Sequence, residues 1–255
     1  MTEHVLGDFS LEGRTALVTG ARTGIGRAVA AGLARAGADL VLHGHRDDLD
    51  EVEAEVKAAG RKAYRWILDL SRPAVIPDAV ADVLGAHQID ILVNNAGVIR
   101  RGPAIDQTYD DWSTVLDVDL DAVFLLSKAV AGPMLERGHG KIIMIASMLS
   151  FQGGVNVVGY TAAKHGVAGL TKALAVEWAP LGVQVNGIAP GYIETSNTMV
   201  LREDADREPA IRARIPAGRW GRPDDLVGAA VFLASPASDY VNGHLLAVDG
   251  GWLAR

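Results

Sequence analysis

The sequence predicts an α/β fold in which helices cover both faces of a doubly wound parallel sheet. Short apolar runs alternate with Ala-rich helical patterns along the chain, and this alternation is typical of a parallel sheet. A glycine-rich loop, residues 20–26, separates the first apolar run from the first helical pattern. That arrangement indicates a Rossmann-type fold. We expect the chain of 255 residues to form a single domain, residues 1–255.

The composition excludes several classes of protein. Hydrophobic residues make up 49% and charged residues 22% of the chain, as in an ordinary globular enzyme. The net charge is −7 and the 24 Lys and Arg residues form no basic cluster, which argues against a nucleic-acid partner. The chain has no cysteine, which excludes disulfides, thiolate metal sites and a cysteine nucleophile. Residues 1–13 lack a signal-peptide pattern and no apolar run reaches membrane-spanning length. We therefore expect a cytoplasmic protein without metal or membrane.

Each predicted strand is a short run rich in Val, Ile and Leu, because the strands of a parallel sheet are buried on both faces. The seven predicted strands are residues 15–19, 39–43, 63–68, 89–93, 141–146, 183–188 and 245–248. Helical patterns separate them, and glycines at 37 and 60 mark two helix ends. The later predicted helices are residues 49–59, 75–84, 112–134, 157–177 and 223–234.

A polar stretch, residues 192–216, follows the sixth predicted strand. It looks too charged to form a core element. Long loops in compact domains are more often functional than structural, so we interpret this stretch as a substrate lid. The alternative is a disordered excursion in the absence of ligand.

The glycine loop fits a dinucleotide-phosphate site. Gly20 permits a tight turn, while Gly24 and Gly26 let the backbone and the next helix approach a pyrophosphate closely. The N-terminus of that helix favours negative charge. Ordinary turn chemistry is the alternative, but the position between a strand and a helix favours the nucleotide site.

Tyr160 and Lys164 lie four residues apart in a predicted helix, so their side chains share a face. A free phenol ionises near pH 10, and an ammonium at about 4 Å stabilises the phenolate by about 4 kcal/mol at an effective dielectric constant near 20. We therefore expect Lys164 to lower the pKa of Tyr160 and to make it an acid/base. Ser147 follows a predicted strand, where ligands bind in open α/β sheets. For the Tyr160 and Lys164 pair alone, a chance pairing on a solvated helix is the alternative.

Several motifs occur together in an order and spacing that resemble the short-chain dehydrogenase/reductase family, over essentially the whole chain. They are Thr19-Gly20-x-x-x-Gly24-Ile25-Gly26, Asn94-Asn95-Ala96-Gly97, Ser147, Tyr160-x-x-x-Lys164 and Pro190-Gly191. The resemblance implies that Tyr160 is the catalytic acid/base and that Ser147 hydrogen-bonds the substrate oxygen. It also implies that Lys164 lowers the pKa of Tyr160 and holds the nicotinamide ribose.

The resemblance further implies a nicotinamide cofactor, with Thr195 at its carboxamide and Asp69 at its adenine amine. Asn95 can contact the cofactor or join neighbouring strand ends. The other residues expected to contact the cofactor are Gly20, Arg22, Thr23, Gly24, Ile25, Gly26, Arg46, Leu70, Ala96, Gly97, Pro190, Gly191 and Ile193.

The choice between NAD and NADP stays open. An NAD enzyme of this fold usually has Asp or Glu at the end of the second strand, where this chain has Gly44. Arg46 is placed to meet the 2′-phosphate of NADP. Against this, Thr23 occupies a loop position that is often basic in NADP-preferring relatives, although Arg22 is adjacent.

Asp119 departs from the family pattern, which usually has an asparagine that kinks the central helix and relays protons from the lysine. An aspartate keeps the size and an acceptor but loses the amide donor and adds charge. We expect either reduced turnover or a role for Asp119 through its backbone carbonyl, and we count it among the catalytic residues.

A narrower resemblance, to the 2-deoxy-D-gluconate 3-dehydrogenases or 2-dehydro-3-deoxy-D-gluconate 5-dehydrogenases, is carried by segments 95–101, 146–154, 215–221 and 248–255. It implies a deoxy sugar acid as substrate, whose carboxylate an arginine can bind. Gln152 and Trp220 are expected to contact hydroxyls or simply to pack. The candidate arginines are Arg101 first, then Arg100, Arg219 and Arg255, and the alternative for each is a surface or subunit ion pair.

Other interpretations stay open. The same motifs serve relatives that act on 3-oxoacyl thioesters or polyols, and Asp119 allows a nucleotide-binding regulator without turnover. A glycine loop can also bind S-adenosylmethionine, but Tyr160 and Lys164 would then have no purpose. The resemblance implies a homotetramer formed through two long helices and the last strand. Small residues on one of these helices suit packing between subunits or within one: Ala162, Ala163, Gly166 and Ala168.

Overall fold

The computed structural model describes residues 5–255. Met1–His4, which belong to the stretch expected to lack a signal-peptide pattern, lie outside the described residues. Seven strands form one parallel sheet in the order β3-β2-β1-β4-β5-β6-β7. This confirms the predicted fold class. The strands are β1 (Thr15–Val18), β2 (Asp39–Gly44), β3 (Ala63–Ile67), β4 (Ile91–Asn94), β5 (Gly140–Ile145), β6 (Val183–Pro190) and β7 (Leu245–Val248).

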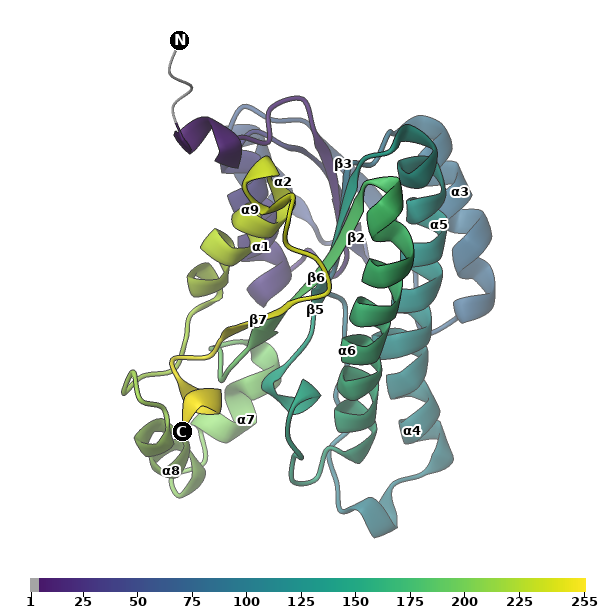
Figure 1. Cartoon of the computed structure of the whole chain (residues 1–255). Coiled ribbons are helices and arrows are strands. Elements are labelled where there is room, and N and C mark those ends of the chain that lie inside the picture. The colour runs from purple at the N-terminus through teal and green to yellow at the C-terminus, as the bar shows by residue number, and fades with distance from the viewer. Residues whose placement is uncertain (1–4) are drawn as a thin grey trace.

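Helices cover both faces of the sheet (Figure 1). One face carries α1 (Gly24–Arg35), α2 (Asp50–Ala58) and α9 (Val227–Ala234), and an apolar core joins these helices to the sheet. The other face carries α3 (Ile76–Ala86), α5 (Ala122–Arg137) and α6 (Val158–Trp178), with a second core. The strand order reverses between β1 and β4, and ligands bind beside such a reversal.

The central helix is not the uninterrupted helix predicted for residues 112–134. It begins as α4 (Tyr109–Leu116), where the Thr108 hydroxyl accepts a hydrogen bond from the Asp111 N–H at 3.0 Å. Residues Asp117–Asp121 then form a π-helical turn before α5 begins. Such turns are frequent at functional sites. This one carries Asp119 into the interior, where its side chain is fully buried.

The polar stretch 192–216 contains α7 (Met199–Arg202) and α8 (Arg207–Arg214). The prediction that it is too charged to form a core element was wrong, because Leu201, Ile211 and Ile215 are buried there. Their partners come from distant parts of the chain, so the stretch by itself gives little sign of them. Together they form a third, smaller apolar cluster with Met148, Trp220 and Trp252.

The small residues of α6 pack mainly within the subunit. Ala163 is fully buried and Ala168 is nearly so. A Cβ atom at Gly166 would lie 2.9 Å from Leu120 Cδ1, so the glycine allows α6 to approach the π turn. Ala163, Gly166 and Ala168 therefore pack within the subunit, while Ala162 is half-buried and its role between subunits stays a prediction. Exposed apolar side chains of α5 and α6 include Phe124 and Val176.

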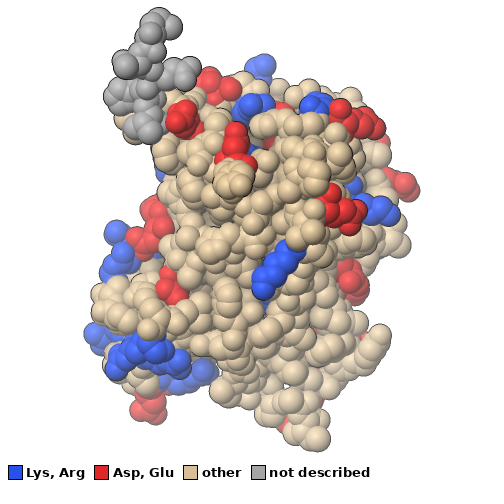
Figure 2. Space-filling model, viewed as in Figure 1, with Lys and Arg blue, Asp and Glu red and all other residues tan. Residues whose placement is uncertain are grey.

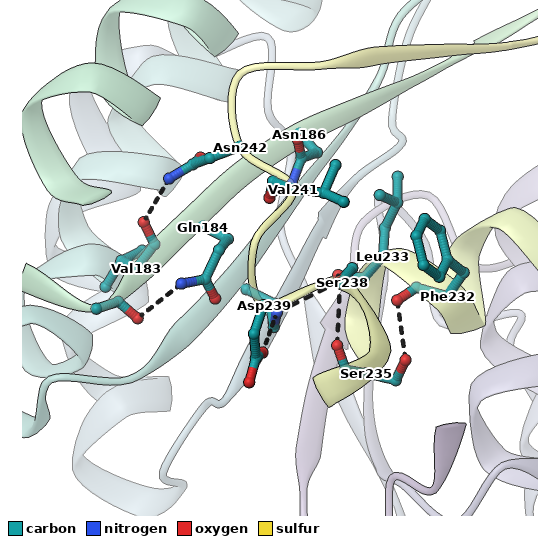
Figure 3. A network of polar contacts seen from close by, with 12 residues as sticks. Val183, Gln184, Asn186, Phe232, Leu233, Ser235, Ser238, Asp239, Val241 and Asn242 are labelled. Carbon is teal, nitrogen blue, oxygen red and sulfur yellow. Dashed lines mark hydrogen bonds and ion pairs between the residues drawn. The ribbon is translucent and has the colours of Figure 1, made fainter. Parts of the chain in front are cut away.

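A polar network fastens the amino end of the sheet, opposite the strand ends that bind ligands (Figure 3). Lys141 at the start of β5 is only 1% exposed, and its Nζ donates to Ser238 Oγ at 3.3 Å and to Asp239 Oδ1 at 2.7 Å. Asn186 Nδ2 donates to the Val241 carbonyl at 2.8 Å. These contacts tie the connection between α9 and β7 to β5 and β6. Burial lowers the pKa of Lys141, and the Asp239 carboxylate opposes that effect.

Within residues 5–255, no helix is both long enough and apolar enough to cross a membrane.

Candidate active site

A cavity of about 520 Å³ runs along the carboxyl ends of β1 to β5. It brings together most residues predicted to contact a cofactor, together with Tyr160, Lys164 and Asp119: Gly20, Arg22, Thr23, Gly24, Ile25, Gly26, Asp69, Leu70, Asn95, Ala96, Gly97 and Thr195. No group of three His, Cys, Asp or Glu side chains that could hold a metal ion occurs in the part of the chain that the structure describes.

Four predicted cofactor residues do not line this cavity. Arg46 lies beyond its edge, where Gly44 and His45 form the wall. Pro190 is the last residue of β6, and Ile193 is buried and pairs with Gly221. Gly191 lines a second cavity instead. Contact of these four residues with the cofactor therefore stays a prediction.

The glycine loop forms a cradle that other residues would fill. Gly20 and Gly24 have φ angles of +63° and +58°, a region that favours glycine. A Cβ atom at Gly26 would lie 2.2 Å from the Gly20 carbonyl oxygen. Thr23 makes no side-chain capping bond, and the first turn of α1 has no acidic residue. The first N–H groups of α1 are therefore open to an anion, which fits a dinucleotide pyrophosphate.

Asn95 joins the ends of β1 and β4. Its Nδ2 donates to the carbonyls of Thr19 at 2.8 Å and Gly20 at 3.1 Å. In return, Thr19 Oγ1 accepts from the N–H groups of Asn95 and Ala96 at 2.9 and 3.0 Å. The Asn95 amide is thus engaged structurally, as the alternative interpretation expected, while the residue still lines the cavity.

His43 is a site residue that the sequence analysis missed. It is buried in β2, and its Nδ1 accepts from the Gly20 N–H at 3.1 Å. Because Nδ1 accepts, Nε2 carries the proton and donates to the Leu68 carbonyl at 3.0 Å. Burial lowers the pKa of His43 to about 4, so the ring is neutral near pH 7. His43 therefore connects the glycine loop to the end of β3. Only its place beside Gly44 could have drawn attention to it.

A second cavity, of about 260 Å³, lies beside the first. Tyr160 lines both, and among the described residues it is the only one shared by the two linings. Ser147 lines the second cavity, and its Oγ accepts from the Leu149 N–H at 3.1 Å. Lys164 lines the first, with Nζ 5.3 Å from the centroid of the Tyr160 ring and a hydrogen bond to the Ile145 carbonyl at 3.0 Å. The predicted trio therefore assembles where the cavities meet.

The expected lowering of the Tyr160 pKa is not found in this structure. Burial disfavours the phenolate and raises the pKa of Tyr160. The Lys164 ammonium and the Ser147 hydroxyl act in the opposite direction, but the Asp119 carboxylate adds to the rise. The prediction expected the ammonium to outweigh the cost of burial and did not include the Asp119 charge.

Asp119 enters the site through its side chain. Its Oδ2 lies 3.4 Å from Lys164 Nζ, and its Oδ1 accepts from the Val98 N–H at 2.7 Å. Burial raises the pKa of Asp119 and outweighs the opposing effect of Lys164. Burial alone lowers the pKa of Lys164, but the negative charges of Tyr160 and Asp119 reverse this and raise it.

The second cavity is basic. Arg101, Arg207 and Arg214 line it, and none of its lining residues is acidic. Arg101 was predicted to bind the substrate carboxylate, and the structure places it in this cavity. The sequence analysis did not identify Arg207 and Arg214 as site residues. Their spacing of seven residues, which places them on one side of a helix, was the available signal.

The other candidate arginines do not line the second cavity and have partners of their own, although Arg100 lines the first cavity. Arg100 pairs with Asp111 at 3.7 Å and Arg219 with Asp225 at 2.7 Å, as the ion-pair alternative expected. Arg255 Nη1 donates to the Ala213 carbonyl at 3.2 Å.

Gln152 and Trp220 play different parts. Gln152 lines the second cavity, where its Oε1 accepts from Trp252 Nε1 at 3.2 Å. Trp220 is 5% exposed and packs in the third apolar cluster, outside the cavity lining.

The chain is similar in sequence and in fold to known oxidoreductases. Residues 20–253 match the family described as Enoyl-(Acyl carrier protein) reductase. A 2-dehydro-3-deoxy-D-gluconate 5-dehydrogenase from Bacillus subtilis (strain 168) is 57% identical over 247 residues, which cover 97% of each chain. A structure from Agrobacterium tumefaciens, assigned as a 2-deoxy-D-gluconate 3-dehydrogenase with bound NADP, has a TM-score of 0.92 and 55% identity, covering 97% of this chain and 99% of that one. A structure from Beutenbergia cavernae, assigned as an NAD(P)-dependent gluconate 5-dehydrogenase with NADP at low occupancy, has a TM-score of 0.96 and 53% identity, covering 98% of this chain and 100% of that one.

The fold and these matches define an oxidoreductase with a Rossmann-type sheet. The chain belongs to the short-chain dehydrogenase/reductase family.

Proposed function

We propose that this protein transfers a hydride between NAD(P) and a secondary alcohol or ketone of a deoxy sugar acid, of the 2-deoxy-D-gluconate or 2-dehydro-3-deoxy-D-gluconate type. One observation carries the proposal: Tyr160 stands between a dinucleotide-sized cavity and a smaller one lined by three arginines and no acid. Guanidinium groups bind carboxylates through paired hydrogen bonds. The named activities of the similar proteins support the same substrate class.

In this proposal, the residues around Tyr160 move and hold one proton. Tyr160 protonates the substrate oxygen during reduction and takes that proton back during oxidation. The Ser147 hydroxyl donates to the same oxygen, and Lys164 stabilises the phenolate as the proton leaves. Asp119 balances the charge of Lys164 from 3.4 Å. The nicotinamide, when bound, supplies or accepts the hydride.

The cavity wall at β2 supports acceptance of NADP. The strand ends at Gly44, so no carboxylate meets the ribose hydroxyls there. Arg22 lines the cavity and lies 3.4 Å from Asp48, a half-exposed pair that a phosphate could replace. The NADP in two similar structures agrees with this reading. We therefore expect the protein to accept NADP.

Three further parts of the proposal concern the whole protein. Residues 192–216 act as a lid over the second cavity, because Tyr192, Thr198, Leu201, Arg207 and Arg214 all line it. The exposed apolar side chains of Phe124 and Val176 support a homo-oligomer, a tetramer by resemblance. The absence of cysteine suits the cytoplasm.

Other carbonyl substrates fit the second cavity less well. Polyols have no anionic group, and the oxoacyl portion of a 3-oxoacyl thioester carries none either. Either would leave three guanidinium groups around the cavity without an anion. A sugar acid is therefore preferred.

The test follows nicotinamide absorbance with 2-deoxy-D-gluconate and with NAD and NADP in parallel. We expect turnover by the wild type and a loss of about 10²-fold or more in Tyr160→Phe. Tyr240→Phe is the matched control, because Tyr240 is fully exposed, and it should keep wild-type activity. Reduction of a 3-oxoacyl thioester or a polyol ketone without any turnover of sugar acids would overturn the proposal.

A further inference from the structure

Two arginines of α8 line the second cavity, and among the described residues neither guanidinium group has an ion-pair or hydrogen-bond partner. Arg207 and Arg214 begin and end this helix, two turns apart, on the same side. Their guanidinium groups form no ion pair and no hydrogen bond with other side chains or carbonyls within residues 5–255. Arg212, on the same helix, differs: it pairs with Glu208 at 2.9 Å and does not line the cavity.

Arg214 is held in place by Trp252. Its guanidinium carbon lies 4.0 Å from the centroid of the Trp252 ring, a stacking geometry that leaves the N–H edges of the guanidinium free. Trp252 is fixed in turn by its hydrogen bond to Gln152 and by the ring of Tyr192, 4.9 Å away at 67°. The arginine is therefore oriented before any ligand binds.

Arg101 is the third arginine that lines the second cavity. It comes from the loop after β4, and its Nη2 donates to the Asn197 carbonyl at 3.1 Å, next to α7. Burial and the nearby charge of Arg207 lower the pKa of Arg101. Figure 2 shows Lys and Arg side chains gathered over the part of the molecule where α8 lies. Like charges at one cavity destabilise each other until an anion enters.

We propose that Arg207 and Arg214 bind the substrate carboxylate together with Arg101, and that α8 thereby selects anionic sugar substrates. This inference rests on the proposed function and names the residues that recognise its substrate. Because α8 packs in the third apolar cluster and not in the two cores of the sheet, the bound carboxylate also fastens residues 192–216 over the cavity. Selection and closure then depend on the same two side chains.

Steady-state kinetics test the inference. The variants are Arg207→Gln, Arg214→Gln and the double variant, each with 2-deoxy-D-gluconate and with a neutral polyol of similar length. A charge-assisted hydrogen bond contributes about 1.5–3 kcal/mol, which corresponds to a rise in KM of roughly 10- to 150-fold for the acid. KM for the polyol and for NADP should stay within about twofold, because neither contacts these residues in the proposal.

Arg212→Gln is the matched control, since it removes a charge from the same helix outside the cavity. Arg207→Lys and Arg214→Lys keep the charge and should recover part of the affinity. Loss of the stack on Trp252 can destabilise Arg214→Gln, so thermal unfolding is followed for every variant. Arg207 has no such stack, and Arg207→Gln alone keeps the test decisive.

Equilibrium binding separates this inference from the proposed function. Calorimetric titration of 2-deoxy-D-gluconate into the NADPH-loaded protein reads carboxylate binding without turnover, because the reduced nucleotide cannot accept a hydride from the alcohol. Binding by the wild type that is lost in both Gln variants supports the role of α8, even if the acid is not turned over. Wild-type affinity in both Gln variants, an equal loss in Arg212→Gln, or no binding by any form would overturn it.

Discussion

Asp119 Oδ2 lies 3.4 Å from Lys164 Nζ, and both side chains are buried where the π turn of the central helix faces α6. Gly97 makes room for this carboxylate, since a Cβ atom there would lie 2.8 Å from Oδ2. The family pattern has a neutral amide at this position, so the chain carries an additional negative charge beside its acid/base. That charge raises the pKa of both Lys164 and Tyr160.

Asp119→Asn should shift the pH dependence of alcohol oxidation to lower pH. Oxidation requires ionised Tyr160, and removal of the Asp119 charge removes one cause of its raised pKa. The pH at which kcat/KM reaches half its maximum should therefore fall. Steady-state oxidation rates measured from pH 6 to 11 check this.

Asp121→Asn is the control for this shift, because Asp121 ends the same π turn but is exposed. Its pH profile should match that of the wild type. A profile of Asp119→Asn that moves to higher pH, or does not move, would contradict the role assigned to the carboxylate.

Arg22→Gln should weaken NADP more than NAD. Arg22 lines the first cavity near the end of β2, where a 2′-phosphate would lie. Loss of one charge-assisted hydrogen bond raises KM for NADP by about 10-fold or more, while KM for NAD should change little. Arg35→Gln is the matched control, because Arg35 is exposed in the last turn of α1 and lies outside the cavity lining. Equal losses with both nucleotides would argue against a phosphate contact.

His43 should make the protein less stable as the pH falls from about 6.5 to 4. Its folded pKa is about 4, below the ordinary value of 6.5. The unfolded chain therefore binds the proton first, and the free energy of unfolding falls across this window by about 3 kcal/mol in total. Urea unfolding at a series of pH values measures the slope.

His43→Gln should flatten this slope, because glutamine does not titrate, and it keeps both an acceptor and a donor. His165→Gln serves as the control, since His165 is exposed on α6. An unchanged slope in His43→Gln would show that other groups cause the pH dependence.

Lys141→Met should leave the free energy of unfolding within about 1 kcal/mol of the wild type, or raise it, because a buried ammonium is costly to desolvate. Asp239 keeps its contact with water, with a side chain 63% exposed. Lys141→Ala should instead cost about 2 kcal/mol or more, because it leaves a cavity. Chemical denaturation of both variants checks the contrast; equal losses in the two would mean that the ion pair itself stabilises the sheet.

The sequence was sufficient to predict the parts of the site that depend on topology. Residues after β1, β4 and β5 meet because the carboxyl ends of parallel strands share one edge of the sheet. Gly20, Asn95 and Ser147 therefore assemble as expected. The placement of Tyr160 and Lys164 on one face of α6 could be predicted from the periodicity of a helix alone.

Features of the site that depend on tertiary packing could not be predicted from the sequence. The π turn at Asp117–Asp121 has no periodicity that separates it from an α-helix. Arg207 and Arg214 become cavity residues only because Trp252, far along the chain, packs beside α8. The raised pKa of Tyr160 depends on burial that four-residue spacing does not reveal.

The buried ammonium of Lys141 also makes local opening of the sheet measurable by chemical labelling. An amine-reactive reagent can reach a lysine that is 1% exposed only after the connection at Ser238 and Asp239 has opened. Exposed lysines such as Lys57 would react at once. The rate of Lys141 modification relative to that of Lys57, measured by mass spectrometry, would therefore report how often this end of the sheet opens locally in an otherwise folded molecule.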